Sequence, residues 1–223
     1  MSSLAAAIVV GMMAFSAAPA VATEVSAPEA TALAEFRTNL VERGDSAGVA
    51  KFDALNAEQR AELAGYFVGE VTPNFGLGST SGTTKTQRDG DFAFSQSAAA
   101  PVTKGAALAA ATIKNVWGKQ WFSFAGIKIT ETKVSLNYYV SGGRATSVAS
   151  YTCTVEQNAD PTASITSSKA GSYISGSNAV GECKVVVKRG APTPWGTWSW
   201  STSSGIQYVT GSGTGSYVSG GWR

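Results

Sequence analysis

The chain has 223 residues, of which 14% are charged, 25 are glycine and none is histidine, and its formal net charge is +2. Soluble proteins carry about a quarter charged residues on average, so this chain depends on Ser, Thr and Gly for its solubility. We interpret this composition as a sign of a released all-β protein. The absence of histidine excludes Ser-His-Asp and Cys-His catalysis and the usual zinc sites. The small net charge and the lack of a recognition motif argue against nucleic acid as a partner.

The N-terminus has the pattern of an export signal. An apolar run at 4–15 is followed by Ala-Pro-Ala-Val-Ala at 18–22, which offers two overlapping small-x-small cleavage sites. This predicts a signal peptide over residues 1–22 and a secreted, extracellular protein. No Lys or Arg precedes Arg37, so either the true start lies upstream of Met1 or the signal is atypical. The run is too short and too rich in alanine for a good membrane anchor.

Residues 23–70 form an acidic segment with a helical pattern. The segment holds nine acids and four bases, a net charge of −5, whereas residues 71–223 carry a net charge of +7. Pro28 suits a first helical turn, Asn56 and Gln59 resemble a capping box, and Gly69 is a stop signal. We therefore expect two or three short helices between residues 28 and 68. The apolar residues at helical spacing are Leu33, Phe36, Leu40, Val41, Leu63, Tyr66 and Phe67.

Residues 71–112 are rich in Gly, Ser, Thr and Ala, which is typical of a linker. One hairpin is expected within it, around Asp89-Gly90-Asp91.

From residue 113 to 223 the apolar pattern has a period of two, as in Val134, Leu136, Tyr138 and Val140. The sequence predicts strands at 120–124, 127–131, 134–140, 148–155, 163–166, 183–188, 196–201, 206–210 and 216–219, with a turn at 141–143. The expected fold is mainly β: an antiparallel β-sandwich or small barrel of about eight strands, preceded by a short α-helical segment.

Cys153 and Cys183 lie in segments with strand-like sequence and without C-x-x-C spacing, so neither zinc binding nor a redox motif is supported. We expect them to form a disulfide, because the chain has an export pattern. The alternative is a pair of buried free thiols.

The tryptophans suggest a binding surface. They occur at Trp117 and Trp121 and again near the C-terminus, and alternation places Trp198 and Trp200 on one face of a strand. An exposed row of indoles would stack on sugar rings or anchor a protein interface, whereas a buried row would fill the core. The candidate ligand-binding residues are Trp195, Trp198, Trp200 and Trp222.

Carboxylates are the remaining route to catalysis, since a glycosidase needs two of them across a cleft. The acids of the β half are Asp89, Asp91, Glu131, Glu156, Asp160 and Glu182. Nothing in the sequence pairs any two of them, and the Asp-Gly-Asp fragment lacks the other ligands of a calcium loop. We therefore expect no catalytic residue, no metal and no cofactor.

The function expected from these patterns is that of a secreted, non-enzymatic binding or surface-interaction protein whose ligand is a glycan or another protein. The alternative is a membrane-active secreted protein, in which the acidic helical segment masks the basic β domain through opposite charge and its apolar row. A carboxylate-dependent hydrolase is the third hypothesis.

Overall fold

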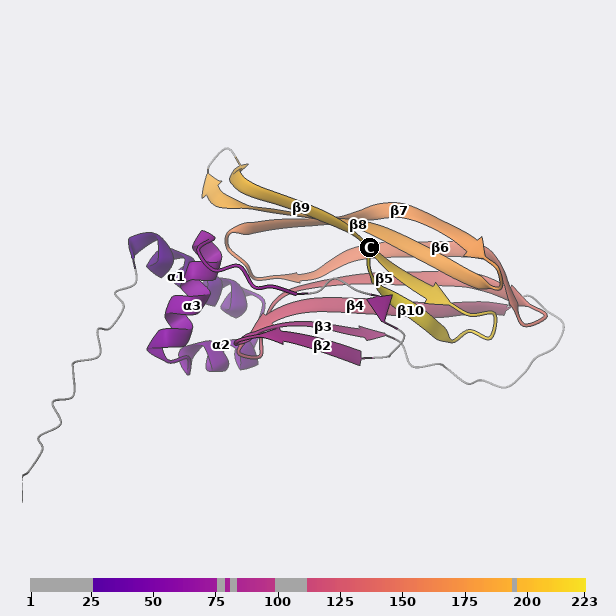
Figure 1. Ribbon diagram of the computed structural model, residues 1–223, viewed down its shortest axis with the longest axis horizontal. Helices are drawn as coiled ribbons and strands as arrows, with labels where there is room; N and C mark the ends of the chain where they lie inside the picture. The colour runs from indigo at the N-terminus through magenta and orange to yellow at the C-terminus, as the bar shows by residue number, and fades with distance from the viewer. Residues whose placement is uncertain (1–25, 76–78, 81–83, 99–111, 194–195) are drawn as a thin grey trace, which may run out of the picture.

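The computed structural model describes residues 26–75, 79–80, 84–98, 112–193 and 196–223, with the side chains of 79–80 and 191–200 left out. These residues form two antiparallel β-sheets packed face to face, with helices at one end of the long sandwich (Figure 1). The fold is therefore mainly β with a short N-terminal helical segment, as the sequence predicts. The predicted signal peptide, residues 1–22, lies outside the described part.

The described chain begins with three short helices whose ends follow local sequence signals. Asn56 and Gln59 form the expected capping box, in which the Asn56 side chain accepts from the Gln59 backbone N–H at 2.8 Å. Gly69 ends the last helix with a φ of 87°, a left-handed conformation that glycine adopts without strain. The helices are α1 (Ala27–Glu42), α2 (Ser46–Asp53) and α3 (Ala57–Val68).

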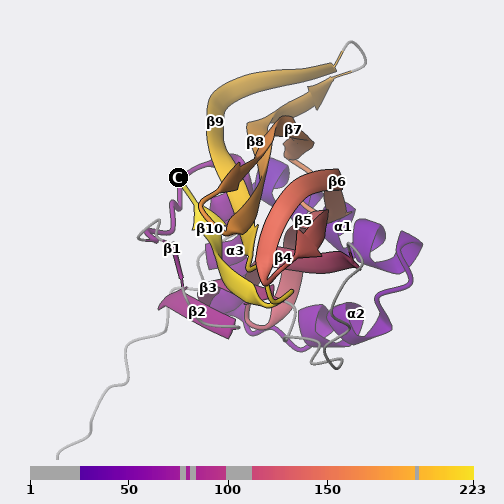
Figure 2. The ribbon, with the colours of Figure 1, turned by 90° about the vertical axis from the view of Figure 1, so that its right-hand side faces the viewer.

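The strands follow one another as antiparallel neighbours in two sheets. One sheet has the order β2-β3-β4-β5-β6 and the other β1-β10-β9-β8-β7. The two sheets are separate layers (Figure 2), so of the two expected architectures the protein adopts the sandwich and not a closed barrel. The strands are β1 (Ser79–Thr80), β2 (Thr84–Asp89), β3 (Phe92–Ala98), β4 (Thr112–Phe124), β5 (Ile127–Ser141), β6 (Arg144–Asn158), β7 (Ala163–Ser175), β8 (Asn178–Thr193), β9 (Gly196–Gly211) and β10 (Tyr217–Trp222).

Several strands are longer than the sequence pattern indicates. β5 spans both 127–131 and 134–140, and β9 spans both 196–201 and 206–210. Gly205 breaks the pattern of β9, yet the strand needs it: a Cβ there would lie 2.9 Å from Cε3 of the Trp222 ring.

The segment 71–112 contains the expected hairpin, β2 and β3, and β3 pairs along its full length with β4. The β-sheet therefore includes residues that precede position 113.

The core between the sheets contains large side chains of β5 opposite small residues of the other sheet. Leu136 and Tyr138 are fully buried. Gly181 and Gly211 leave room for them, since a Cβ at Gly211 would collide with the Tyr138 hydroxyl. That hydroxyl donates to the backbone oxygen of Ser212 at 2.8 Å, and burial raises the pKa of Tyr138 to about 12.

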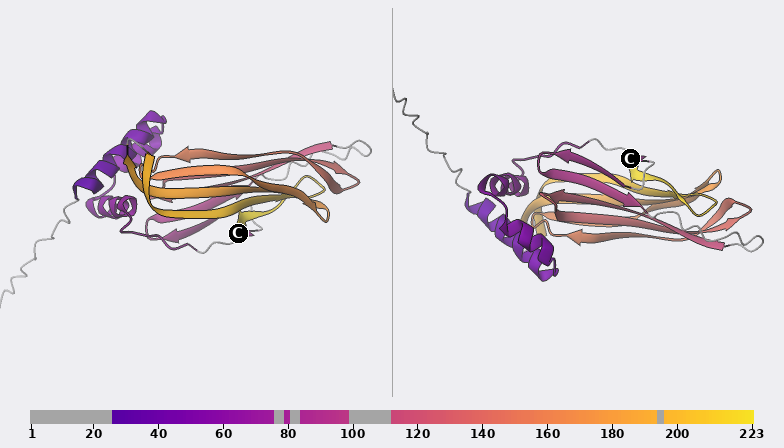
Figure 3. Two further views of the ribbon diagram at one scale, coloured as in Figure 1. Left: turned by 90° about the horizontal axis from the view of Figure 1, so that it is seen from above. Right: turned by 90° about the horizontal axis from the view of Figure 1, so that it is seen from below.

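The helices lie at one end of the sandwich (Figure 3), and a second core of buried side chains joins them to the sheets there. Phe36 and Leu63 from the helices are fully buried together with Phe124 and Ile127 from the sheet. Val41, which shares the helical spacing of the apolar row, is instead 53% exposed. The helices are thus packed against the sheet ends through a shared apolar core.

Candidate functional site

The predicted tryptophan row is described only at its C-terminal member. Trp195 lies outside the described residues, and the side chains of Trp198 and Trp200, which belong to β9, also lie outside. Trp222 is half-buried, its ring lies against Gly205, and its indole Nε1 is buried without a hydrogen-bond partner among the described atoms. Trp222 therefore packs against the neighbouring strand β9 and keeps part of its surface accessible.

The two cysteines are bonded to each other, as predicted. Cys153 lies in β6 and Cys183 in β8, with Cα atoms 5.6 Å apart. Because β6 and β8 belong to different sheets, the disulfide links the two layers of the sandwich.

The acids of the β half are mostly paired with cations, and two of them, Glu131 and Glu156, share Lys119. Asp89 and Asp91 flank the β2–β3 turn, and Asp91 accepts a hydrogen bond from Gln59 of α3 at 2.8 Å. Glu182 pairs with Arg223. Within the described ranges, no group of three or more His, Cys, Asp or Glu side chains is arranged to hold a metal ion.

A different pair of tryptophans lies on the outer face of the β2–β6 sheet. Val116 of β4 is 1% exposed and points into the core. Because side chains alternate along a strand, Trp117, Lys119 and Trp121 point outward, and both indoles are half-buried. On the neighbouring strand β5, the register places Ser135, Lys133 and Glu131 opposite them. We call this surface the Trp–Lys face; it comprises Trp117, Lys119 and Trp121 of β4 and Lys128, Glu131 and Lys133 of β5.

Glu131 holds the lysines of the Trp–Lys face in place. Its side chain is 4% exposed; one carboxylate oxygen lies 2.7 Å from Lys119 Nζ, and the other pairs with Lys128. Glu156 of β6 also lies 3.7 Å from Lys119 Nζ. Burial opposes ionisation of Glu131, but the hydrogen bonds from Lys119 and Lys128 outweigh burial and lower its pKa. Glu131 is therefore ionised at neutral pH.

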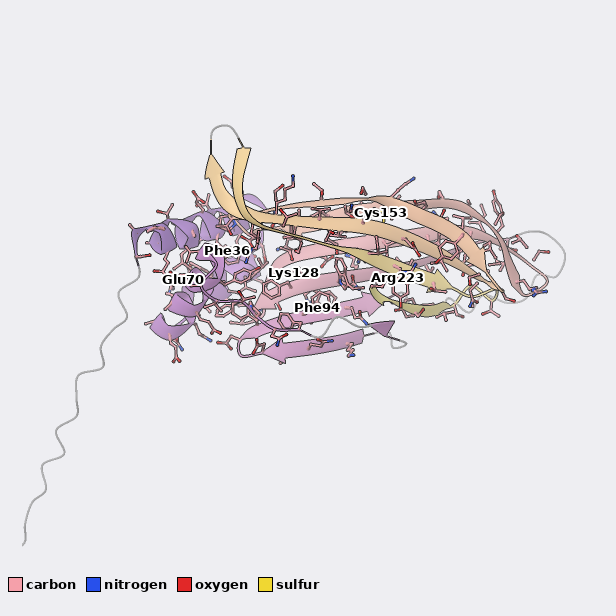
Figure 4. All side chains as sticks on the ribbon, turned by 45° about the horizontal axis from the view of Figure 1, so that its top comes forward. Phe36, Glu70, Phe94, Lys128, Cys153 and Arg223 are labelled. Atoms are coloured by element: carbon pink, nitrogen blue, oxygen red, sulfur yellow. A yellow bond between two sulfur atoms is a disulfide. The ribbon has the colours of Figure 1, made fainter. Side chains whose placement is uncertain are left out.

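Two lysines of this face also contact the indole rings. Lys128 Nζ lies 5.3 Å from the centroid of Trp121, and Lys133 Nζ lies 5.8 Å from the centroid of Trp117. Such cation–π contacts stabilise exposed pairs by about 0.5–1 kcal/mol. They restrict the orientation of both indoles. Lys128, labelled in Figure 4, lies toward the helical end of the sheet.

Beyond Trp117 the face continues as a row of cross-strand hydrogen bonds. The Asn115 side chain donates to Ser135 Oγ at 3.1 Å and to Asn137 Oδ1 at 2.8 Å. Asn137 in turn donates to Ser150 Oγ at 3.0 Å. These bonds fix the polar groups in place, so the face presents ordered donors and acceptors beside the two indoles.

Sequence reasoning concentrated on the C-terminal tryptophans and did not select Trp117 or Trp121 as site residues. The signal that could have found them is the alternation in Trp117-Gly-Lys119-Gln-Trp121, which places the named residues on one strand face. The position of Glu131 opposite Trp121 could not be found in this way, because the register of two strands is not visible in one of them.

The protein is thus a two-layer antiparallel β-sandwich with a helical segment at one end, and the Trp–Lys face lies on the outside of one layer. Comparison with known protein families, curated protein sequences and solved structures finds no match. None of the described helices combines the length and the apolar character needed to cross a membrane.

Proposed function

We propose that this chain is a secreted, non-enzymatic binding protein whose Trp–Lys face takes a polysaccharide chain. The observation that carries the proposal is the placement of two half-buried tryptophans on one open sheet face. Their Cα atoms are four residues apart on β4, about 13 Å at the rise of a strand. Two indoles at this separation would contact successive parts of an extended glycan. Release from the cell is supported by the export pattern and the disulfide.

The charges of the face largely cancel, which favours a neutral glycan over a polyanion. Lys119 and Lys128 share Glu131, and Glu156 lies beside Lys119, so with Lys133 the three lysines and two carboxylates leave a net charge of only +1. Binding therefore depends on stacking and on hydrogen bonds to sugar hydroxyls rather than on the release of counterions. We expect affinity to change little with salt concentration.

The test is binding of neutral β-glucan and chitin oligosaccharides to the purified protein and its variants, measured by calorimetry. Trp121→Ala and Trp117→Ala should each weaken binding at least tenfold, or about 1.4 kcal/mol. The matched control is Tyr173→Ala, which removes a 43% exposed aromatic ring from the other sheet and should leave affinity unchanged.

Three results would contradict the proposal. If both tryptophan variants bind the oligosaccharides like the parent, the Trp–Lys face is not the site. If the protein binds heparin but no neutral glycan, and salt abolishes that binding, the lysines act as an anion site instead. Retention of a protein partner that Trp121→Ala abolishes would assign the face to protein recognition.

A further inference from the structure

A cavity of about 480 Å³ lies between the two sheets, at the end that the helices cover. Its walls come from the segment that follows α3 and from both sheets. Binding sites for small molecules are about 300–1,000 Å³ in size, whereas one water molecule takes about 30 Å³ of liquid. The cavity is therefore far larger than a packing defect and falls in the range of ligand sites.

One wall of the cavity is aromatic. Phe122 is the centre of this wall, with ring centroids 5.1 Å from Tyr66 and 5.9 Å from Phe75. Phe94 continues it, 6.2 Å from Phe75. Phe75, Phe94 and Phe122 are only half-buried, although they lie at the junction of helices and sheet. The rings thus retain accessible surface that a bound molecule would cover.

The opposite wall is aliphatic and belongs to the other sheet. Ala163 and Ile165 of β7 line the cavity together with Val187 of β8. Ser164, between the two β7 residues, is exposed. The cavity is thus a slot with rings on one side and aliphatic side chains on the other, which suits a flat or chain-like apolar body.

The charged groups of the cavity neutralise each other. Arg189 pairs with Asp160, donates to the Tyr66 backbone oxygen at 3.3 Å and lies 3.8 Å above the Tyr66 ring. Asp160 is 1% exposed and also accepts hydrogen bonds from the backbone and hydroxyl of Thr162, at 2.9 and 2.8 Å. A carboxylate ligand could not replace Asp160 without breaking these bonds, and beside Asp160 it would meet a like charge.

We propose that this cavity binds an uncharged amphiphile, with its hydrocarbon body between the aromatic and aliphatic walls and one hydroxyl or carbonyl near Arg189. The guanidinium has N–H groups to share with a neutral acceptor while it keeps Asp160 as its counterion. This site is separate from the Trp–Lys face, which lies on the outside of the sheet, so each can be tested without the other.

The first test measures binding of Nile red, a flat uncharged dye with a carbonyl group, to the purified protein by its fluorescence. Dodecanol and dodecanoate, which share a chain and differ in charge, then compete with the dye. We expect saturable binding of the dye and at least tenfold stronger competition by the alcohol. Equal or stronger competition by dodecanoate, or no saturable binding, would overturn the proposal.

The second test places a bulky side chain inside the slot. Ala163→Trp should weaken dye binding at least tenfold, whereas Ser164→Trp, which adds the same indole on the outward face of β7, should not change it. If near-ultraviolet circular dichroism shows that Ala163→Trp is not folded, Val187→Phe replaces it as the slot variant. Lys188→Phe, on the outward face of β8, then replaces Ser164→Trp as the control. Equal affinity of a folded slot variant and its outward control would show that the dye binds elsewhere.

Discussion

At the scale of single residues, Glu131 combines burial with two cationic partners. It is one of the few charged residues in the buried set, and it orders both Lys119 and Lys128 beside the indoles. A buried carboxylate is stable as an ion only when its hydrogen bonds offset the loss of water. Loss of this one charge would therefore loosen the Trp–Lys face as well as lower stability.

We predict that Glu131→Gln lowers the free energy of unfolding by about 1–3 kcal/mol at neutral pH, because Lys128 loses the carboxylate it pairs with and Lys119 keeps only the more distant Glu156. The folded pKa of Glu131 lies below its ordinary value of 4.5, so its contribution is present above that pH and is lost as pH falls through the folded pKa. Urea unfolding at neutral pH and in acid should show the difference between variant and parent shrinking in acid. Glu156→Gln, at a 34% exposed carboxylate, should cost less than about 1 kcal/mol. A difference that persists in acid would mean that the charge is not its cause.

At the scale of elements, the helical segment contacts the sheets through apolar packing and hydrogen bonds to backbone oxygens. The masking hypothesis requires opposite charges to draw the two parts together, yet among the described residues no ion pair joins an acid of 26–70 to a base of the β-sheets. Lys51 donates to the Gly126 oxygen at 2.8 Å, and Arg43 donates to the Asn158 oxygen at 3.2 Å. The net charges of the two parts are thus a weak guide to how the segment is held.

We predict that Phe36→Ala, which empties a fully buried site of the shared core, destabilises the protein by about 3–5 kcal/mol. Val41→Ala, on the same helix but 53% exposed, should change stability by less than about 0.5 kcal/mol. Both values should be the same in low and high salt, because the contact is apolar.

Two outcomes would speak against this account of the helical segment. A loss that grows in low salt would restore a role for charge. Separate melting of helices and sheets in circular dichroism would support the membrane-active alternative, in which the helical segment is a removable mask.

The helices and strands also show which structural features can be predicted from the sequence alone. Helix ends depend on neighbouring residues, so the Asn56–Gln59 box and Gly69 were predictable. The continuity of β9 was not predictable. A glycine at position 205 suggests a break in the strand, and only the Trp222 ring on the next strand shows why a glycine is needed there. The cavity could not be foreseen either, since its walls combine residues as distant as Phe75 and Val187.

At the scale of the whole molecule, the Cys153–Cys183 bond is a covalent link between the two layers (Figure 4 labels Cys153). The fold class followed from the alternation of apolar residues and the turn signals, because both are properties of the chain itself. Which sheet each strand joins was not predictable, since it depends on pairings across the molecule.

We predict that replacing both cysteines with alanine lowers the free energy of unfolding by about 3–4 kcal/mol, because a loop with a sequence separation of 30 is no longer closed in the unfolded chain. Thiol titration of the denatured, unreduced parent should find no free thiol. The matched comparison is reduction of the parent, which should give a similar loss. Two free thiols in the parent, or an unchanged stability of the alanine variant, would contradict the structural role of the bond.

The pairing of β1 with β10 has a consequence for the order of folding. Ser79 and Thr80 pair with Gly221 and Gly220, so the first strand of the chain completes its sheet with the last one. The β2–β6 sheet pairs sequence neighbours and can form early, whereas the β1–β10 contact closes a long loop at an entropic cost. Until residues 217–222 pair with β9, that strand has an open edge, and the chain is then most exposed to pairing with other chains.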